Sequence, residues 1–570
     1  MKPVRILTRP VDENANRTLL AQGVDPLLAR LYATRFVQHK QETEHNLSAL
    51  LPFHDLKNIQ AASERLAQAI RNKEKILIVA DYDADGATAC AVGIRGLQAM
   101  GASIEFLVPN RFEHGYGLTP EIAEMAANAG TKLLLTVDNG IASLAGVEHA
   151  QQLGMDVLIT DHHLPGEKLP DCIIVNPNQP GDTFASKSLA GVGVMFYVLM
   201  ALRQHLRQTA WFNSQRPEPN LAQWLDLVAL GTIADVVPLD HNNRILVTQG
   251  LRRIRAGKMQ TGISALFTIA KRKPEQAQTM DLGFCIAPRL NAAGRLDDMS
   301  LGIACLLCDD NEQARDLAEQ LNELNHERRQ IQRDMQNEAD VQLTDINPVN
   351  HHSIVVYHDN WHQGVVGIVA GRLREKYHRP SIVFAPAENN TLRGSGRSIP
   401  GLHLRDALDL VSKQHPELIQ KFGGHAMAAG LSLLATNLSA FQQAFEKVCR
   451  QLISSEDLHH IFQTDGILDS QYLNLTTAQL LNTLVWGQNF PEPSFCNEFI
   501  VVNQQPVGTG HTKALLRYDN QECEAMFFRC TTTLPEHIRA VYRLIANEWR
   551  QRWELQLHVD YWEMCTYNNL

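Results

Sequence analysis

The sequence predicts an α/β protein that begins with a doubly wound parallel sheet and ends in a small β-barrel. Three observations predict this architecture. Short apolar runs alternate with helical stretches between residues 75 and 175, which is typical of a parallel sheet. A long charged stretch without Gly or Pro covers residues 309–340. Short strand-like runs bounded by turn signals follow residue 462, as expected of an oligonucleotide-binding-type barrel.

The first part of the chain is expected to be helical before the sheet begins. Apolar residues recur at helical spacing after Pro26 and again over residues 61–71, so residues 1 to about 70 are predicted to form helices. The strands of the sheet are then predicted at residues 76–80, 104–108, 133–137, 157–160 and 173–175. The connecting helices are predicted at residues 88–100, 120–129 and 142–153.

The second part of the chain is predicted to contain a linker helix and two smaller domains. Helical periodicity dominates residues 191–270, with a polar loop near residues 213–220. The stretch 309–340 is predicted to be one solvent-exposed helix between domains, and a second, smaller α/β segment follows it. The predicted divisions of the chain are residues 1–70, 71–308, 309–345, 350–455 and 460–570.

The composition is that of a soluble globular protein. The 570 residues are 44% hydrophobic and 20% charged, and this length predicts two to four domains. The N-terminus lacks the apolar core of a signal peptide, and no apolar run approaches the ~20 residues of a membrane span. A cytoplasmic location without membrane contact is therefore expected. Ten scattered cysteines fit a reducing compartment, and the close pair Cys305 and Cys308 is expected to pack in the core.

The charge pattern leaves the question of a nucleic-acid partner open. The formal net charge is −10, which does not favour such a partner, but net charge is a poor guide when charge is segregated. No acidic residue lies between His241 and Pro274, and residues 372–405 contain seven Arg or Lys residues against two Glu. Each basic stretch is either a solvated helix face or a set of phosphate contacts.

Carboxylates and histidines follow directly after three of the predicted strands. The carboxyl ends of neighbouring parallel strands lie side by side, and ligands bind there. Such a concentration of like charge requires protons or cations, and divalent metal neutralises it most simply. A further acid, Asp235, precedes apolar residues that favour its burial. The residues at the strand ends are Asp81, Asp83, Asp85, Asp138, Asp161, His162 and His163.

Each of these residues also has a purely structural interpretation. Asp83 and Asp85 could cap a helix, Asp138 could belong to a simple turn, and the histidine pair could be structural. Because all of these positions coincide with the ends of adjacent elements, a metal centre is favoured, and imidazole among the ligands favours Mn²⁺. Glycines next to Arg or His form either tight turns or phosphate-binding loops at residues 287–296, 393–399 and 423–430.

Seven motifs, taken in order along the chain, resemble the DHH phosphoesterase superfamily. The resemblance covers residues 20 to 450, and every motif is intact. It implies a catalytic DHH domain followed by a substrate-binding domain of the DHHA1 type, and it is strongest to the single-strand-specific exonucleases of the superfamily. The motifs are DYDADG, VDNG, DHH, GTIADVVPL, APRLNAAGRL, SGRSI and GGHAMAAG.

The resemblance implies a role for each motif residue. Asp81 and His163 would be further ligands or would orient the ligands, and Asp161 would support them. The ligands of two ions, Mn²⁺ or Mg²⁺, would be Asp83, Asp85, Asp138, His162 and Asp235. The substrate phosphates, including a terminal 5′-phosphate, would be contacted by Arg289, Asn291, Arg295, Ser395, Arg397, Gly424 and His425.

The activity implied by the resemblance is hydrolysis of single-stranded DNA to mononucleotides, stepwise from the 5′ end, in recombination and repair. Two metal ions would activate the attacking water, and His163 or Arg397 would stabilise the non-bridging oxygens. The barrel would stack bases on Tyr518 and Phe528. The implied partners are single-stranded DNA with a 5′ end, a single-stranded DNA-binding protein and a RecQ-like helicase, and the protein is expected to be a monomer.

Two other functions compete with this one. A small-substrate relative, such as a nanoRNase, a cyclic-dinucleotide phosphodiesterase or a family II pyrophosphatase, would leave the linker helix and the barrel without a purpose. The pyrophosphatases also have a histidine where this chain has Val79. A non-catalytic scaffold that binds single strands would be expected to have lost metal ligands, and this chain retains all of them.

Overall fold

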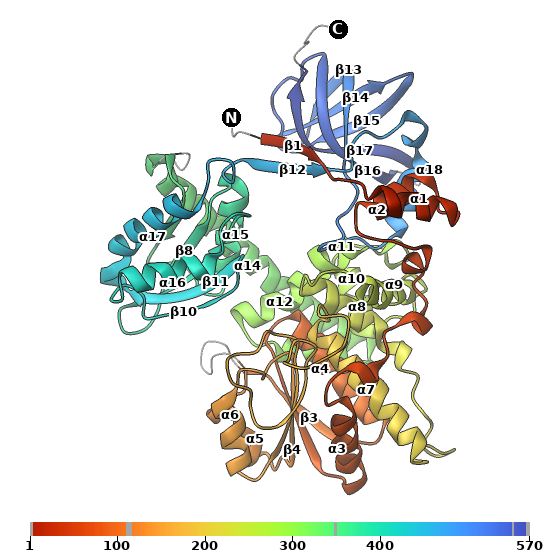
Figure 1. The fold of residues 1–570 in the computed structure, drawn as a ribbon, viewed down its shortest axis with the longest axis vertical. Helices are drawn as coiled ribbons and strands as arrows, with labels where there is room; N and C mark the ends of the chain where they lie inside the picture. Colours follow the sequence, from red (N-terminus) through yellow and green to blue (C-terminus); the bar gives the residue numbers. More distant parts are fainter. Residues whose placement is uncertain (1–3, 110–116, 347–349, 550–551, 566–570) are drawn as a thin grey trace. The chain divides into compact units, whose positions relative to one another are not determined.

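A five-stranded parallel sheet forms the centre of the first α/β domain in the computed structural model (Figure 1). Its strand order is β3-β2-β4-β5-β6, and every neighbouring pair is parallel. The pairing Ala80↔Val137 and Val137↔Thr160 aligns the carboxyl ends of three strands. The strands are β2 (Lys75–Ala80), β3 (Ser103–Leu107), β4 (Leu133–Val137), β5 (Asp156–Thr160) and β6 (Ile173–Val175), which confirms the predicted α/β core.

The structure describes residues 4–109, 117–346, 350–549 and 552–565. The chain divides into two compact units. One contains Met1–Leu7 and Glu323–Phe462, and the other contains Thr8–Asn322 and Gln463–Leu570. Within the described ranges, no helix is both long and apolar enough to cross a membrane.

Closely packed helices surround the parallel sheet. α4 (Ala84–Ala99) is rich in Ala and Gly and is buried along most of its length. Its small residues allow close contact: a Cβ atom at Gly96 would lie 2.3 Å from a methyl group of Leu199. The other helices of this domain are α5 (Pro120–Asn128), α6 (Leu144–Gln152), α7 (Gly191–Gln208), α8 (Leu225–Ala234), α9 (His241–Arg255), α10 (Thr261–Ile269), α11 (Thr279–Asp281), α12 (Ala287–Leu296) and α13 (Ser300–Leu307). Cys305 and Cys308 are buried, as expected.

The N-terminal segment is only partly helical. It contains the predicted helices α1 (Glu13–Ala21), α2 (Pro26–Ala33) and α3 (Ile59–Asn72), but it begins with the strand β1 (Val4–Thr8). The expectation of helix throughout residues 1–70 is therefore wrong at its start. β1 pairs with β12 (His460–Thr464), a partner more than 450 residues away that helical periodicity cannot reveal.

A buried ion pair joins the N-terminal segment to the residues that follow β12. The Arg35 guanidinium donates to both carboxylate oxygens of Asp465, at 2.8 and 3.0 Å, and Arg9 donates to the same carboxylate at 3.2 Å. Arg35 and Asp465 are almost completely inaccessible to solvent. This contact lies within one compact unit and joins its two chain segments, Thr8–Asn322 and Gln463–Leu570.

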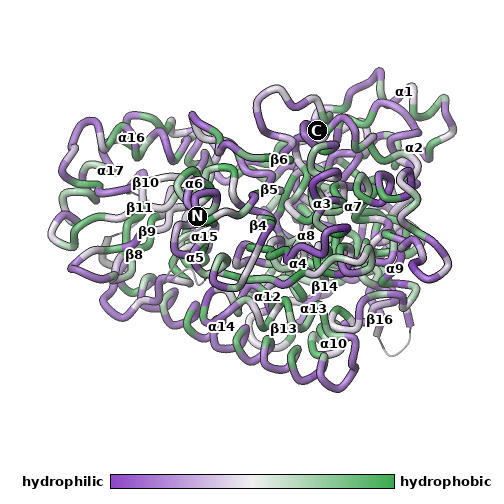
Figure 2. Tube along the Cα trace, turned by 90° about the horizontal axis from the view of Figure 1, so that it is seen from below, coloured by the Kyte–Doolittle hydropathy of each residue, from purple (hydrophilic) through white to green (hydrophobic). Residues whose placement is uncertain are grey.

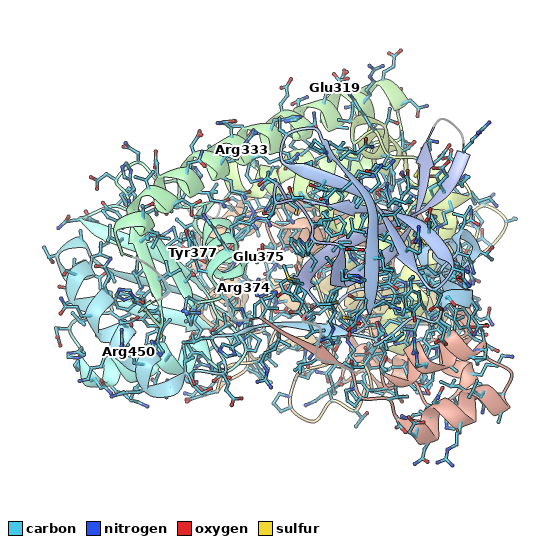
Figure 3. The ribbon with its side chains drawn as sticks, turned by 90° about the horizontal axis from the view of Figure 1, so that it is seen from above. Glu319, Arg333, Arg374, Glu375, Tyr377 and Arg450 are labelled. Atoms are coloured by element: carbon cyan, nitrogen blue, oxygen red, sulfur yellow. The ribbon has the colours of Figure 1, made fainter. Side chains whose placement is uncertain are left out.

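The predicted linker helix is present as α14 (Asn311–Ile346). Glu319 and Arg333 on this helix are exposed (Figure 3), but Leu321 and Met335 are buried. Hydrophilic and hydrophobic segments accordingly alternate along α14 (Figure 2). The expectation of a fully solvent-exposed helix is therefore wrong on one side, because apolar residues recur at helical spacing among the charges. The boundary between the two units falls within α14, at residues 322 and 323.

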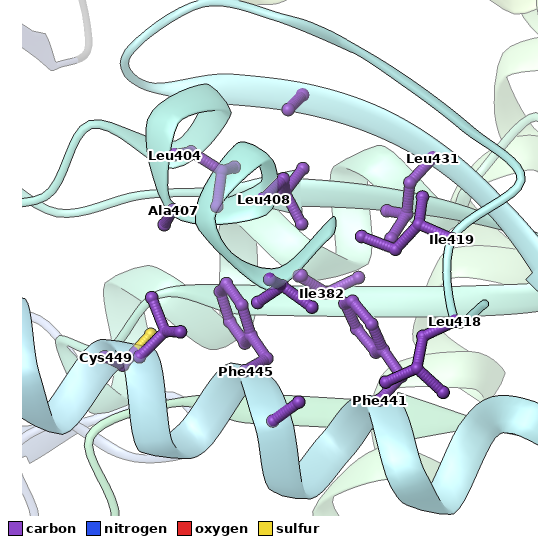
Figure 4. Close-up of a cluster of buried hydrophobic side chains, with 14 of the residues drawn as sticks. Ile382, Leu404, Ala407, Leu408, Leu418, Ile419, Leu431, Phe441, Phe445 and Cys449 are labelled. Carbon is purple, nitrogen blue, oxygen red and sulfur yellow. The ribbon is translucent and has the colours of Figure 1, made fainter. Parts of the chain in front are cut away.

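A second five-stranded sheet, in the order β10-β11-β9-β8-β7, forms the smaller α/β domain. α16 (Leu404–Gln414) and α17 (Leu438–Leu452) cover one of its faces through a core that contains Phe441 and Phe445 (Figure 4). A further helix of this domain is α15 (Val366–Tyr377). The strands are β7 (Ile354–Tyr357), β8 (Ser381–Pro386), β9 (Thr391–Arg397), β10 (Lys421–Gly424) and β11 (Ala428–Leu434).

The C-terminal segment folds as a closed five-stranded barrel in the order β13-β14-β15-β17-β16, which confirms the predicted barrel. A short helix, α18 (Leu475–Thr483), precedes the barrel and contacts β16. The strands are β13 (Phe495–Val507), β14 (His511–Tyr518), β15 (Gln521–Phe527), β16 (His537–Trp549) and β17 (Arg552–Met564).

Candidate active site

The predicted acidic and histidine residues lie together at the carboxyl ends of β2, β4 and β5. The described residues form three overlapping groups, and within each group the potential ligand atoms lie within 4.8 Å of one another. Because the strand ends are aligned in the sheet, residues far apart in the sequence reach one point. The groups are Asp81 with Asp83 and Asp138, Asp85 with His162 and Asp235, and Asp138 with His162 and His163.

The loop after β2 holds its carboxylates through backbone hydrogen bonds. Asp83 is the N-cap of α4, and its Oδ1 accepts from the N–H groups of Asp85 and Gly86 at 2.9 and 3.1 Å. The helix-cap interpretation of this motif is therefore correct, and it is compatible with metal binding because Oδ2 makes neither of these bonds. The loop is tight: a Cβ atom at Gly86 would lie 2.5 Å from the Asp81 carbonyl oxygen.

The Asp85 carboxylate points at the N-terminus of α7. Its Oδ2 accepts from the Gly191 N–H at 2.6 Å, and its Oδ1 accepts from the Val192 N–H at 3.0 Å. The first N–H groups of a helix have no partner within the helix and favour an anion. The carboxylate of Asp85 is thus fixed in orientation by two donors that the sequence motif does not contain.

Asp138 follows β4 in a left-handed conformation with φ of 62°. This conformation is uncommon for a residue other than glycine and often occurs at functional sites. The neighbouring Asn139 is fully buried and donates to the carbonyl oxygens of Val79 and Val137, which fixes the turn across β2 and β4. Gly191 lies against Asp138: a Cβ atom there would lie 2.6 Å from the Asp138 side chain.

His162 presents one ring nitrogen to the carboxylates. Its Nε2 lies 3.2 Å from Asp138 Oδ1 and 3.4 Å from Asp235 Oδ2, and this buried nitrogen has no hydrogen-bond partner among the described residues. The ring also forms a hydrogen bond with the backbone of Leu189. Burial, and then the charge of His163, lower the pKa of His162 to about 4. The ring is therefore neutral, with a lone pair directed between two carboxylates, as a metal ligand requires.

His163 and Asp161 form an ion pair beside this site. His163 Nδ1 lies 2.7 Å from Asp161 Oδ1, and the Asp161 carboxylate also accepts from the N–H groups of His162, His163 and Ile141. Burial by itself would lower the pKa of His163, but the hydrogen bond and charge of Asp161 raise it to about 9. His163 is consequently a cation at neutral pH, next to a site that would bind phosphate.

The remaining carboxylates cannot all be ionised without a cation. Burial, and then the charges of their neighbours, raise the pKa values of Asp81, Asp138 and Asp235 well above the usual range, and raise that of Asp85 to about 7. An uncompensated buried charge is strongly unfavourable. Oxygen-rich ligands with one neutral imidazole are suitable for Mn²⁺ or Mg²⁺, so the residues present fit a divalent metal site.

α12 closes against the loop after β2. Asn291 Oδ1 accepts from the Ala84 N–H at 2.8 Å, and Gly294 lies so close that a Cβ atom would be 1.8 Å from the Tyr82 carbonyl oxygen. Asn291, a predicted substrate residue, therefore braces the loop that carries Asp81, Asp83 and Asp85. Arg289 on the same helix donates to Asn322 and to the Cys285 carbonyl oxygen, and Arg295 lies in the last turn.

The other predicted substrate residues lie in the second α/β domain. Arg397 Nη1 donates to Ser395 Oγ at 3.0 Å and to the Gly396 carbonyl oxygen at 2.9 Å. Gly424 has φ of 139°, which favours glycine, and begins the turn that leads to the exposed His425. Ala428 at the end of this turn pairs with Arg397 in the sheet. Arg397 and the turn that begins at Gly424 are therefore neighbours within this domain.

The two basic stretches are not uniform surfaces. Arg244 is buried, stacks on Phe490 and donates to two backbone carbonyl groups, so it is neither a solvated residue nor a phosphate contact. Arg374 donates to the adjacent Glu375 on α15 (Figure 3). Arg393 is exposed. Only some of the basic residues are therefore available to a ligand.

Several residues that shape the site escaped sequence reasoning. Gly191 and Val192 hold Asp85, and Asn178 donates to the carbonyl oxygens of His162 and Lys187 at 2.6 and 3.2 Å. The only signal in the sequence is the small size of Gly191 at the start of a helical run. The donors themselves are backbone groups or a common amide, which no motif distinguishes.

A parallel sheet whose strand ends carry this carboxylate and histidine cluster, followed by a smaller mixed α/β domain, defines a metal-dependent phosphoesterase of the DHH type. The chain matches the DHH family N-terminal domain over residues 75–232, the DHHA1 domain over residues 350–451 and the RecJ OB domain over residues 464–561. The chain belongs to the RecJ family of single-stranded-DNA-specific exonucleases.

Two RecJ proteins match this chain along almost their whole length. The chain is 48% identical to RecJ of Salmonella typhimurium, covering 98% of this chain and 99% of the relative. It is 47% identical to RecJ of Escherichia coli, covering 98% of each. A crystal structure of Thermus thermophilus RecJ in complex with Mn²⁺ matches with a TM-score of 0.83 and 28% identity, covering 99% of this chain and 80% of that one. The Mg²⁺ complex of the same protein matches with a TM-score of 0.77 and 26% identity, covering 99% of this chain and 79% of that one.

Proposed function

We propose that the chain is a metal-dependent exonuclease that hydrolyses single-stranded DNA from its 5′ end and releases mononucleotides, acting in DNA recombination and repair. The observation that carries this proposal is the complete carboxylate and histidine cluster at the strand ends in a chain of the RecJ family. A non-catalytic scaffold would not require such a cluster. A small-substrate phosphodiesterase would not account for the C-terminal barrel, which is matched by the RecJ OB domain.

The proposed metal ligands are Asp83, Asp138, His162 and Asp235, with Asp138 between two of the ligand groups. Mn²⁺ or Mg²⁺ is the proposed ion, as in the solved RecJ complexes. Asp81 is the better candidate for a fifth ligand. Asp85 also lies near His162 and Asp235, but both its oxygens already accept backbone N–H groups, and this fits a residue that braces its neighbours.

The protein residues have distinct tasks in the proposed hydrolysis. Bound divalent ions would lower the pKa of the attacking water and neutralise the phosphate. The Leu189 backbone and Asn178 hold His162 with its Nε2 toward the carboxylates. His163, kept cationic by Asp161, can stabilise the negative charge that develops on a non-bridging oxygen.

The proposed phosphate-binding residues are charged or small side chains on α12 and on the second α/β domain. Arginine binds phosphate through two parallel hydrogen bonds, and a glycine turn exposes backbone N–H groups. The set is Arg289, Asn291, Arg295, Ser395, Arg397, Gly424 and His425. A cytoplasmic monomer that receives its strand from a single-stranded DNA-binding protein or a RecQ-like helicase remains part of the proposal.

The proposal can be tested with one oligonucleotide labelled at either end, offered as a single strand and as a blunt duplex with Mn²⁺, Mg²⁺ or EDTA. The matched variant is Asp138→Asn, which keeps the shape of the side chain but removes its charge. Metal-dependent release of labelled mononucleotide from the 5′ end of the single strand by the native chain alone supports the proposal. Release from the 3′ end would contradict the polarity. Binding without cleavage in either metal would support a scaffold, and cleavage of dinucleotides only would support a small-substrate enzyme.

A further inference from the structure

On the sheet face away from α16 and α17, α15 packs against β8 and β9. The same face of β10 and β11 is exposed at Lys421, Gly423 and Gly430, next to the predicted phosphate-binding residues. Side chains alternate along β9: Leu392, Gly394 and Gly396 are buried, whereas Arg393 is exposed and Ser395 and Arg397 are half-buried. The buried set faces the core formed with α16 and α17. Arg393 therefore lies on the same side of the sheet as Ser395 and Arg397, because alternate residues of a strand share a face.

Two cations flank a shallow cavity on this face. The cavity measures about 390 Å³ and is lined by Arg393, Gly394, Lys421, Phe422, Gly423, Gly430, Leu431 and Ser432. No carboxylate is among the described residues that line it, and neither cation has an ion-pair partner among them. Arg393 makes one long hydrogen bond, of 3.4 Å, to Gln363. The cavity therefore has uncompensated positive charge.

The sheet surface between the two cations, which forms the floor of the cavity, carries few side-chain atoms. Lys421 pairs with Ser432, which pairs with Arg393, so the cations are two strands apart, or about 10 Å. In the next row Gly423 pairs with Gly430. Packing against the described residues does not explain these two glycines. A Cβ atom at Gly423 would have no neighbour among them within 4 Å, and one at Gly430 would have only a carbonyl oxygen at 3.9 Å.

Glycines elsewhere in the same sheet contrast with this pair. A Cβ atom at Gly394 would lie 2.5 Å from the Phe384 ring, and one at Gly396 would lie 2.8 Å from Leu404, so core packing explains both. A strand-interior glycine that the protein itself does not require often marks a place where a ligand approaches the backbone. Gly423 and Gly430, together with the flanking cations Arg393 and Lys421, indicate that an anionic ligand lies flat on the sheet.

We propose that the groove between Arg393 and Lys421 binds the sugar-phosphate backbone of the single-stranded DNA substrate beyond its terminal nucleotide. This inference rests on the proposed exonuclease function. Arg393 is four residues from Arg397 in an extended strand, or about 13 Å, so the two arginines contact different parts of the bound strand. Contacts to phosphate and sugar position a strand without reading its sequence, as degradation of any sequence requires.

The test measures DNA binding separately from cleavage. Binding of a fluorescent 5′-phosphorylated 12-mer is followed by anisotropy in EDTA over a range of salt concentrations, with the double variant Arg393→Ala/Lys421→Ala. Loss of two exposed charge contacts is expected to weaken binding about tenfold. The salt dependence of log K is expected to become less steep by about 1.4, because each single-strand phosphate contact contributes about 0.7.

A matched control removes two charges from the opposite side of the domain. Lys413→Ala/Lys447→Ala has the same change in net charge, on α16 and α17, and is expected to leave the affinity and the salt slope unchanged. Gly430→Ala tests whether the ligand approaches the backbone between the two cations. The added methyl group meets no described protein atom closer than 3.9 Å, so thermal stability is expected to be retained. The affinity for the 12-mer is expected to fall several-fold, because the methyl group occupies the place of the ligand.

Three outcomes would overturn the inference. The first is an unchanged salt slope for Arg393→Ala/Lys421→Ala, and the second is an equal effect of the control pair. The third is an equal loss of affinity for a 5′-phosphorylated mononucleotide, which would place the terminal nucleotide in the groove. Failure of the exonuclease proposal is seen separately, as absence of Mn²⁺-dependent cleavage by the native chain, while the binding results in EDTA are unaffected.

Discussion

Replacing Gly367 by alanine is expected to impair the enzyme through Arg397 without destabilising the fold. Gly367 lies in the first turn of α15, and a Cβ atom there would lie 2.9 Å from Ser395 Oγ and 3.0 Å from Arg397 Nη2. Ordinary contact requires about 3.5 Å, so the two groups must move by about 0.5 Å. Because a displacement of 1 Å can cost about a hundredfold in rate, kcat/KM is expected to fall about tenfold, or about 1.4 kcal/mol of transition-state stabilisation.

Gly371, one turn further along α15, is the matched control. A Cβ atom at this position would have no neighbour within 4 Å in the described part of the chain. Gly371→Ala is therefore expected to retain full activity and to raise the free energy of unfolding by about 0.5–1 kcal/mol, the usual difference between Gly and Ala within a helix.

The assay compares steady-state hydrolysis of a 5′-phosphorylated oligonucleotide with urea unfolding for both variants. A separate determination of kcat and KM shows whether Arg397 acts in binding the substrate or in stabilising the transition state. If Gly367→Ala matched Gly371→Ala in both activity and stability, Ser395 and Arg397 would not depend on the close approach of α15, and the reasoning would be refuted.

Three further perturbations act on other parts of the molecule. Without metal, the free energy of unfolding is expected to fall as pH rises from 5 to 8, because the pKa of Asp85 is raised to about 7 and its carboxyl stabilises the folded state only while it is protonated. Mn²⁺ at a hundred times its Kd should add about 2.7 kcal/mol to the free energy of unfolding at pH 7.5. A pH-independent stability in EDTA would contradict this prediction. Asp465→Asn is expected to lose about 3–5 kcal/mol in urea unfolding, because it leaves the buried Arg35 uncompensated; a loss below 1 kcal/mol would contradict this. Asn178→Ala is expected to lower kcat 10- to 100-fold with an unchanged circular dichroism spectrum, because His162 loses its support; full activity would show that the Leu189 contact is sufficient.

The elements that could be predicted from the sequence are those defined by local pattern. The strands of the parallel sheet are short apolar runs between turn signals, and their predicted positions agree with β2 to β6 to within one residue at each end. α14 is defined by an equally local pattern. For the barrel, the sequence predicts strand-like runs after residue 462 but not the bounds of β13 to β17. β1 was missed because its strand character depends on β12, and the burial of Leu321 and Met335 depends on neighbours that a helical period does not identify.

The division of the chain into units depends on contacts that no linear pattern contains. Residues 8–322 and 463–570 form one compact unit although about 140 residues separate them. The buried ion pair between Arg35 and Asp465 joins these segments, and neither residue belongs to a recognisable motif. Composition could reveal the order of the domains along the chain, but the tertiary contacts decide which segments share a core.

The proposed choice of ligands within DYDADG depends on contacts outside the motif and leads to a last prediction. Asp81, Asp83 and Asp85 are equivalent in the motif, but α4 begins after Asp83, so Asp85 follows helical rather than extended geometry. Its carboxylate meets the N–H groups of Gly191 and Val192, more than a hundred residues later, while Asp81 stays with Asp83 and Asp138.

If Asp81 is a ligand as proposed, Asp81→Asn is expected to abolish the stabilisation of the protein by Mn²⁺, because a carboxylate ligand is then lost. Asp85→Asn should retain it with an affinity reduced about 10- to 100-fold, as for loss of a group that orients the ligands. Thermal unfolding at increasing Mn²⁺ concentration distinguishes the two. The reverse order of effects would make Asp85 the ligand, since hydrogen bonds from the α7 amides would then coexist with a metal bond at the same carboxylate.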